Sequence, residues 1–169
     1  RYMFGGEISI PMVLRAPVGG YLSAAAQHSH MFESMFSFIA GLKVVLPSSP
    51  HDAKGLIKSA IRDNNPVIFF EHKKLYEETG PVPAEDYVIP LGKAGIKRPG
   101  KDVTLVTYAY MVGKSLAAAE KLGGEGIDVE VVDLRSVSPI DEDAIVASVK
   151  KTHRLVVVQE TWRRCSVSS

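Results

Sequence analysis

The sequence predicts an α/β fold made of two alternating units. Short apolar runs of strand length alternate with longer segments whose apolar residues recur at helical spacing, and a stretch rich in proline interrupts this alternation once. Apolar residues make up 46% and charged residues 23% of the 169 residues, as in an ordinary globular protein with a core. We therefore expect sheets of parallel strands that are connected by right-handed crossovers, with helices on both faces of each sheet.

In the first unit, we expect strands over 8–15, 42–46 and 67–70 and helices over 29–39 and 53–62. The helices are predicted by apolar residues three and four positions apart, and a Ser-Ser-Pro sequence supplies capping residues before the second helix. The last strand is continuously apolar, which is typical of a strand buried on both faces of a parallel sheet.

Hydrophobic periodicity is lost between residues 71 and 100, where prolines and charges accumulate. We expect an extended linker here, with one short strand near 87–89. The alternation then restarts, since apolar runs and amphipathic segments again follow one another. The expected elements are strands over 103–108, 129–134 and 155–158 and helices over 111–122 and 141–151.

Composition excludes several classes of function. With 20 Lys and Arg against 19 Asp and Glu, the net charge of +1 gives no field that would attract nucleic acid. No apolar run approaches the roughly 20 residues that span a membrane. The single cysteine, Cys165, excludes an intrachain disulfide and fits a reducing compartment. No complete dinucleotide or P-loop phosphate motif is present.

Several polar segments are candidates for chemistry, each with a plainer alternative. His28 and His30 stand at a loop-to-helix junction, where an imidazole can face a cleft; alternatively, one caps or packs and the other is solvated. Gly19-Gly20 allows close approach to a ligand, but a plain turn is the expected role. The run 71–74 follows a buried strand, yet a solvated charge run is favoured. Trp162 with two arginines forms a partner surface or packs under a basic turn.

Motifs along nearly the whole chain carry a resemblance to one enzyme family. The chain resembles the beta subunits of the thiamine-diphosphate-dependent pyruvate, branched-chain 2-oxo acid and acetoin dehydrogenase complexes. The most telling motifs are Tyr2-Met3-x-Gly5-Gly6, Ala25-Ala26-Gln27-His28-Ser29, Gly41-Leu42-Lys43-Val44-Val45-x-Pro47, Ser59-Ala60-Ile61-Arg62-Asp63-Asn64-Asn65-Pro66-Val67 and Val131-Val132-Asp133-Leu134-Arg135.

The resemblance implies a domain order and an assembly. Residues 1–76 would be the latter part of a pyrimidine-binding domain, 77–101 a linker and 102–169 the first part of a transketolase C-terminal-like domain. The expected partners are an alpha subunit, a second beta subunit and a lipoyl acyltransferase core. Thiamine diphosphate and magnesium would be held mainly with the alpha subunit. The enzyme would be found in a bacterial or archaeal cytoplasm, a mitochondrial matrix or a plastid stroma.

The resemblance also implies site residues. His28 matches the family's active-site histidine, which hydrogen-bonds the substrate and supplies a proton during acyl transfer to a lipoyl group, whereas His30 receives no role. A structural potassium ion is expected at backbone carbonyls, for which a plain helix end is an equal alternative. The residues matching that potassium site are Met12, Ala60, Ile61, Asp63 and Asn65.

Two departures from the family pattern limit what this chain does by itself. The family's activating glutamate lies upstream of the matching segment, so we expect a fragment that is inactive alone. Residues 163–169 replace a glycine-rich turn. Pyruvate is the favoured substrate, acetoin dehydrogenase is the alternative within the family, and a non-catalytic α/β interaction module is the alternative from another class.

Overall fold

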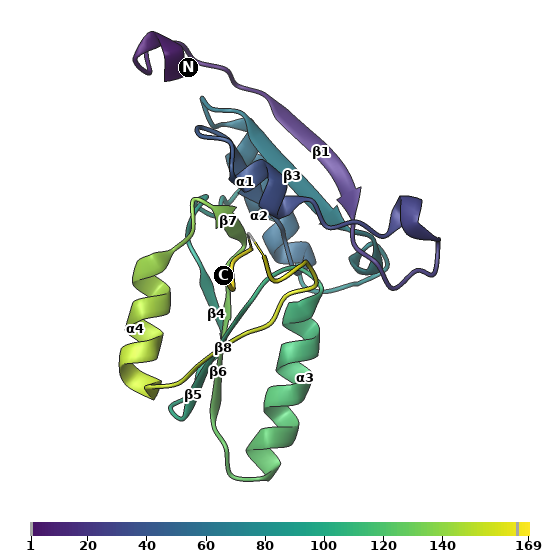
Figure 1. Cartoon of the computed structure of the whole chain (residues 1–169), viewed down its shortest axis with the longest axis vertical. Coiled ribbons are helices and arrows are strands. Elements are labelled where there is room, and N and C mark those ends of the chain that lie inside the picture. The colour runs from purple at the N-terminus through teal and green to yellow at the C-terminus, as the bar shows by residue number, and fades with distance from the viewer. Residues whose placement is uncertain (1, 165) are drawn as a thin grey trace.

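The computed structural model describes residues 2–164 and 166–169, and its strands and helices alternate along the chain (Figure 1). The elements in order are η1 Tyr2–Phe4, β1 Val13–Val18, η2 Ala26–His28, α1 Glu33–Ser37, β2 Lys43–Val45, α2 Pro50–Ile61, β3 Val67–His72, η3 Lys73–Leu75, β4 Gly95–Arg98, β5 Val103–Thr107, α3 Met111–Gly124, β6 Val129–Asp133, β7 Ser136–Ser138, α4 Glu142–Thr152 and β8 Leu155–Val157. The α/β class predicted from the sequence is confirmed. Cys165, on which the expected absence of a disulfide rests, lies outside the described residues.

The strands form two four-stranded sheets. The first has the order β1-β3-β2-β7, in which β1, β3 and β2 are parallel and β7 runs antiparallel to β2. The second has the order β4-β6-β5-β8, in which β6, β5 and β8 are parallel and β4 is antiparallel. Each sheet thus has a parallel body and one short antiparallel strand at its edge.

Helices cover the faces of both sheets, as the alternating pattern predicts. Leu56 and Ala60 of α2 pack on the face of the first sheet that carries Val45 and Phe69. In the second sheet, α3 and α4 lie on opposite faces (Figure 1). The largest apolar cluster joins the other face of the first sheet to the second sheet through Phe70 and Leu134, among others. The two sheets therefore share one core.

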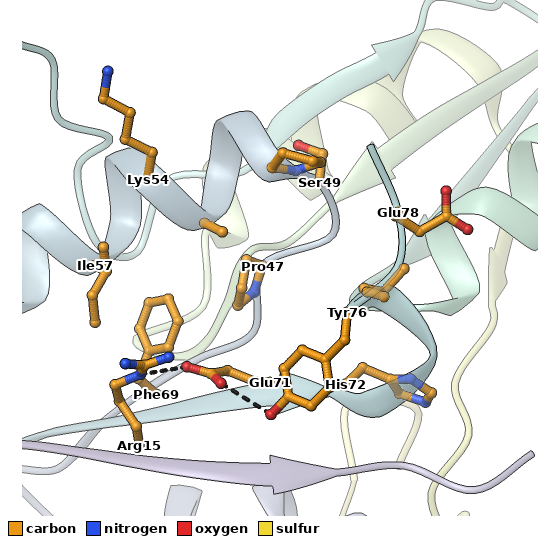
Figure 2. Close-up of a pocket in the computed structure, with 13 residues that line it drawn as sticks. Arg15, Pro47, Ser49, Lys54, Ile57, Phe69, Glu71, His72, Tyr76 and Glu78 are labelled. Atoms are coloured by element: carbon orange, nitrogen blue, oxygen red, sulfur yellow. Dashed lines mark hydrogen bonds and ion pairs between the residues drawn. The ribbon is translucent and has the colours of Figure 1, made fainter. Parts of the chain in front are cut away.

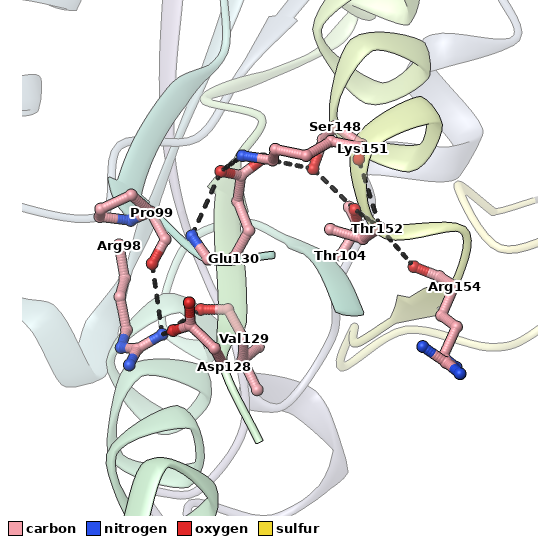
Figure 3. Close-up of polar contacts among 11 residues, drawn as sticks. Arg98, Pro99, Thr104, Asp128, Val129, Glu130, Ser148, Lys151, Thr152 and Arg154 are labelled. Carbon is pink, nitrogen blue, oxygen red and sulfur yellow. Dashed lines mark hydrogen bonds and ion pairs between the residues drawn. The ribbon is translucent and has the colours of Figure 1, made fainter. Parts of the chain in front are cut away.

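A buried polar cluster attaches α4 to the second sheet. The hydroxyl of Thr104 on β5 lies 2.6 Å from that of Ser148 and 2.7 Å from that of Thr152, both on α4 (Figure 3). Ser148 also donates to the Glu130 carboxylate of β6, which pairs with Lys151. Because each buried hydroxyl has a partner, the cluster costs little desolvation and fixes how α4 lies on the sheet.

A second polar cluster joins the two halves of the chain. Asp52 of α2 is fully buried and pairs with Lys97 of β4 and with Arg135, 3.0 Å away. Asp133 at the end of β6 accepts from the Ser48 hydroxyl at 2.5 Å and lies 3.5 Å from Lys97. Burial raises the pKa of Asp133 to about 6, in spite of the hydrogen bond from Ser48 and the charge of Lys97.

The structure corrects several predicted elements. The first strand begins at Val13, beyond Pro11, which has no N–H to donate to a ladder. The helix expected over 29–39 is shorter in the structure, where only Glu33–Ser37 form α1. No strand forms at 87–89, because this segment packs on α2 at Gly55, whose carbonyl accepts from the Ile89 N–H at 3.2 Å. Strands β4 and β7 were not predicted.

Candidate functional site

The carboxyl ends of β1 and β3 form one edge of the first sheet, where open α/β sheets commonly bind ligands. Val18, the last residue of β1, lies opposite His72, the last residue of β3. The chain turns out of β1 through Gly19 and Gly20 into a loop that ends at His30, whose carbonyl accepts from the Gly19 N–H at 2.9 Å. We call residues 19–30 the histidine loop.

His72 is buried beside the start of the histidine loop. Its side chain is fully covered, and its ring stacks on Tyr110, with 4.9 Å between ring centres. Nδ1 accepts from the Lys74 N–H at 3.2 Å, which leaves Nε2 to carry the proton. Nε2 then donates to Oε2 of Glu160 at 2.7 Å.

Glu160 reaches this edge from the second sheet, since it follows β8. Its other oxygen, Oε1, accepts from the Gly20 N–H at 2.5 Å. Burial favours the neutral acid, but the hydrogen bonds from His72 and Gly20 outweigh it, so the pKa of Glu160 lies below its ordinary value. An ionised carboxylate therefore bridges two segments that both belong to the first sheet.

The two glycines permit this close approach. Gly19 has φ +95°, and a Cβ atom there would lie 2.2 Å from Nε2 of His72. A Cβ atom on Gly20 would lie 3.2 Å from Oε1 of Glu160. Gly19-Gly20 is therefore more than the plain turn expected from the sequence, because the backbone here must fit against the side chains of His72 and Glu160.

The backbone of the histidine loop is strained. Tyr21, Ser23 and Ala25 have φ values of +62°, +54° and +59°, in the left-handed region that residues with a Cβ atom avoid at a cost of about 1–2 kcal/mol each. Strain of this kind concentrates at functional sites, where the surrounding structure imposes the conformation. The loop is therefore a candidate for function on backbone geometry alone.

The structure places His28 at the outer part of this loop. It lies in η2 and is exposed, and among the described residues no side chain hydrogen-bonds its imidazole. His30 instead contacts the ring of Phe32 at 5.1 Å. His28 therefore presents both ring nitrogens to solvent or to a ligand, as a histidine that contacts substrate requires.

A buried acid lies near the loop. Glu33 of α1 is 2% exposed and accepts from the Tyr108 hydroxyl at 2.8 Å, while its second oxygen has no partner among the described residues. Burial raises the pKa of Glu33, and the charge of Glu160 adds to that effect. The pKa values of the two glutamates are therefore shifted in opposite directions, that of Glu33 upward by burial and that of Glu160 downward by its hydrogen bonds.

The charge run 71–74 is not simply solvated, contrary to the expectation from sequence. Glu71 accepts from Arg15 at 2.5 Å and from the Tyr76 hydroxyl at 3.0 Å, along one wall of a cavity of about 410 Å³ (Figure 2). The cavity is otherwise lined mainly by apolar side chains, including Ile57 and Phe69. Because Glu71 is already paired on both oxygens, the cavity offers few free polar groups to a ligand.

At the residues matching the potassium site, two backbone carbonyls and the Asp63 carboxylate already accept hydrogen bonds within the chain. The Met12 carbonyl accepts from the Val67 N–H at 2.8 Å, and the Ala60 carbonyl accepts from the Asp63 N–H at 3.3 Å. The Asp63 carboxylate pairs with Lys43 and accepts from the Asn65 side chain at 2.7 Å. Ile61 is largely exposed. In the described part of the chain, no three His, Cys, Asp or Glu residues are placed to hold a metal ion.

Sequence reasoning missed Glu160 and Tyr110 and undervalued His72. Their common signal is position, since each follows the carboxyl end of a parallel strand or forms that end. The expectation that Trp162 packs under a basic turn is wrong, because Trp162 is 86% exposed. None of the described helices is long and apolar enough to cross a membrane.

Comparison with known proteins identifies the family. Residues 1–79 match the pyrimidine binding domain of transketolase, and residues 92–169 match the transketolase C-terminal domain. A split-gene transketolase, solved as an inactive beta4 tetramer, superposes on 98% of this chain and 54% of its own with a TM-score of 0.79 and 25% identity. The chain belongs to the transketolase-like family defined by these two domains.

Within that family, the relatives are beta subunits, as the motifs predicted. The chain is 55% identical to the acetoin:2,6-dichlorophenolindophenol oxidoreductase subunit beta of Cupriavidus necator, over all of this chain and 50% of the relative. It is 49% identical to the pyruvate dehydrogenase E1 component subunit beta of Bacillus subtilis, over all of this chain and 52% of the relative. The chain thus spans about half the length of these relatives.

Proposed function

We propose that this chain forms part of the beta subunit of a thiamine-diphosphate-dependent 2-oxo acid dehydrogenase. The whole enzyme would act with an alpha subunit in an alpha2-beta2 assembly, decarboxylate a 2-oxo acid and pass the acyl group to a lipoyl group on an acyltransferase core. The observation that carries the proposal is the match along the entire chain to 2-oxoisovalerate and pyruvate dehydrogenase beta subunits of Bacillus subtilis, at 48% and 49% identity.

The described residues fit only part of a cofactor site. Among them, no three His, Cys, Asp or Glu residues are placed to hold a metal ion, and the sequence has no complete dinucleotide or P-loop motif. As the family resemblance implies, the diphosphate and magnesium would be held mainly by the alpha subunit. When bound, thiamine diphosphate supplies the electron sink for loss of carbon dioxide. This chain would contribute the histidine loop, in which the exposed His28 hydrogen-bonds the substrate and exchanges a proton with it.

Pyruvate is the favoured substrate, and acetoin is the alternative. Identities of 55% to an acetoin enzyme and 49% to a pyruvate enzyme differ too little to separate the two. Measuring kcat/KM for pyruvate, a branched-chain 2-oxo acid and acetoin with one enzyme preparation decides between them. A preference of about 100-fold or more for acetoin would reverse the order proposed here.

The role of His28 is tested in the full-length beta subunit reconstituted with its alpha subunit. His28→Ala should lower acyl transfer by about 100-fold or more, the scale of general acid-base catalysis, while thiamine diphosphate binding stays nearly intact. His30→Ala is the matched control, since His30 is exposed at the end of the same loop and its ring contacts that of Phe32. Equal turnover in the two variants would remove His28 from the mechanism.

Calorimetry distinguishes this enzyme from a non-catalytic interaction module. Thiamine diphosphate with magnesium should bind to the reconstituted pair and to neither subunit alone, because the proposed site is shared. Absence of binding to the pair would favour the module.

We also propose that potassium binds at backbone carbonyls of the two segments that contain Met12 and Ala60, Ile61, Asp63 and Asn65. The turn after α2 and the segment before β1 are held together there, since the Asn64 carbonyl accepts from the Ile10 N–H at 2.9 Å. Potassium chloride should then raise the melting temperature more than sodium chloride at equal ionic strength. Identical melting temperatures in the two salts would argue against the site.

A further inference from the structure

Glu160 connects the second sheet to the histidine loop of the first. It is separated from Gly20 by 140 residues in the chain, yet its carboxylate accepts from the Gly20 N–H at 2.5 Å and from Nε2 of His72 at 2.7 Å. The side chain of Glu160 is 11% exposed and that of His72 is fully covered. Hydrogen bonds to an ionised group in such surroundings are stronger than neutral bonds in water.

Each partner in this contact has a fixed orientation. The Lys74 N–H occupies Nδ1 of His72, so the ring can offer only an Nε2 proton to Glu160. Tyr110 stacks on the ring at 4.9 Å and limits its movement. On the other side, the two glycines leave no Cβ atom to keep the loop away from His72 and Glu160. The positions of the Gly20 N–H and of Nε2 of His72 therefore fix where the Glu160 carboxylate can lie.

The contact falls where it can control the histidine loop. The loop is closed by the hydrogen bond from Gly19 to the His30 carbonyl, and Gly20 is its second residue. Three left-handed residues follow in the loop, and such a backbone returns to lower-energy conformations unless it is held. An anchor at Gly20 therefore restricts the conformations available to η2 and to His28.

We propose that Glu160 is a positioning residue, whose carboxylate fixes the start of the histidine loop and thereby the placement of the His28 imidazole. This inference rests on the function proposed for His28. Glu160 does not contact the reacting groups in this proposal; it acts through Gly20 and His72. A displacement of about 1 Å in a catalytic group can lower the rate about 100-fold, so loss of the anchor should be visible in turnover.

The kinetic test uses the full-length beta subunit reconstituted with its alpha subunit. Glu160→Ala should lower kcat about 10- to 100-fold while KM changes by less than about twofold. Glu160→Gln keeps an oxygen for the Gly20 N–H but cannot accept from His72 through its amide nitrogen, so its kcat should lie between those of wild type and Glu160→Ala. Glu120→Ala, at an exposed glutamate of α3, is the matched control and should behave as wild type.

Amide hydrogen exchange in the same assembly tests the anchor independently of activity. In Glu160→Ala, the Gly20 amide and the rest of the histidine loop should exchange faster, while the amides of β3 and β5 keep their protection. If Glu160→Ala unfolds, Glu160→Gln carries the test, with faster exchange expected in the same loop. Unchanged exchange in the loop, or a kcat within twofold of wild type in both variants, would overturn the proposal.

The two readouts separate this inference from the proposed function. A wild-type assembly without turnover would refute the enzyme, whereas faster exchange of the Gly20 amide in Glu160→Ala would still support Glu160 as the residue that holds the loop. Normal wild-type turnover with an unchanged loop in the variants would refute only the role of Glu160.

Discussion

The stability of an Asp133→Asn variant relative to wild type should increase as pH rises. Asp133 is fully buried, and its pKa in the folded protein is about 6 against an ordinary value of 3.8. The wild-type stability associated with protonated Asp133 is complete below the ordinary value and is lost as pH rises through about 6. The difference between the two pKa values corresponds to about 3 kcal/mol.

The asparagine side chain of this variant does not titrate, so the variant does not lose the stability that wild type loses when Asp133 ionises. The asparagine oxygen can accept from the Arg135 N–H, as Oδ1 of Asp133 does at 3.1 Å, and the amide nitrogen can donate to the Ser48 hydroxyl, which keeps the local packing. The free energy of unfolding of Asp133→Asn minus that of wild type should therefore increase by up to about 3 kcal/mol between about pH 4 and pH 8. Urea unfolding followed by far-ultraviolet circular dichroism at several pH values measures this difference.

Asp63→Asn provides a contrast of opposite sign. Burial favours the neutral form of Asp63, but hydrogen bonds from Lys43 and Asn65 outweigh it and hold its pKa below the ordinary value. Its contribution to stability is present above that ordinary value and is lost as pH falls, so this substitution should cost most near neutral pH. A difference for Asp133→Asn that is flat, or that decreases as pH rises, would refute the argument from burial.

Two further substitutions test contacts near the histidine loop, each by urea unfolding. Tyr108→Phe should cost about 1–3 kcal/mol, because it removes the buried donor to Glu33; a cost below about 0.5 kcal/mol would mean that the hydrogen bond is not formed. Gly19→Ala should cost more than about 1 kcal/mol, since φ is +95° and the new Cβ meets His72. Gly113→Ala, in α3 with open space around it, should instead stabilise by about 0.5–1 kcal/mol, and equal effects at the two glycines would contradict the geometry.

The sequence predicted the elements whose own residues carry a strong pattern. The continuously apolar 67–70 became β3, and the amphipathic 53–62 became most of α2, because their burial follows directly from hydrophobic periodicity. Strands β4 and β7 carry no such pattern. Each is three or four residues long and exists because it pairs with a distant strand, which a local sequence cannot show.

The candidate site shows the same limit. Family motifs pointed to His28, whose role stays a proposal, but nothing local to Glu160 marks it as a partner of Gly20 at a separation of 140 residues. The burial of His72 likewise depends on Tyr110 and Glu160, which come from the second half of the chain. For a site assembled by tertiary contacts, the sequence could predict the location, at the carboxyl ends of the parallel strands, but not which residues meet there.

The pairing of β7 with β2 means that the two family domains are not separable bodies. Strand β7 comes from the half of the chain that builds the second sheet, yet it completes the first sheet beside Val44 and Val45. If the polypeptide were cleaved between β3 and β4, the two pieces would therefore stay associated through the pairing of β2 with β7. The first piece alone would leave the edge of β2 unpaired. That edge could then pair with β7 of a neighbouring molecule, which would give a domain-swapped dimer.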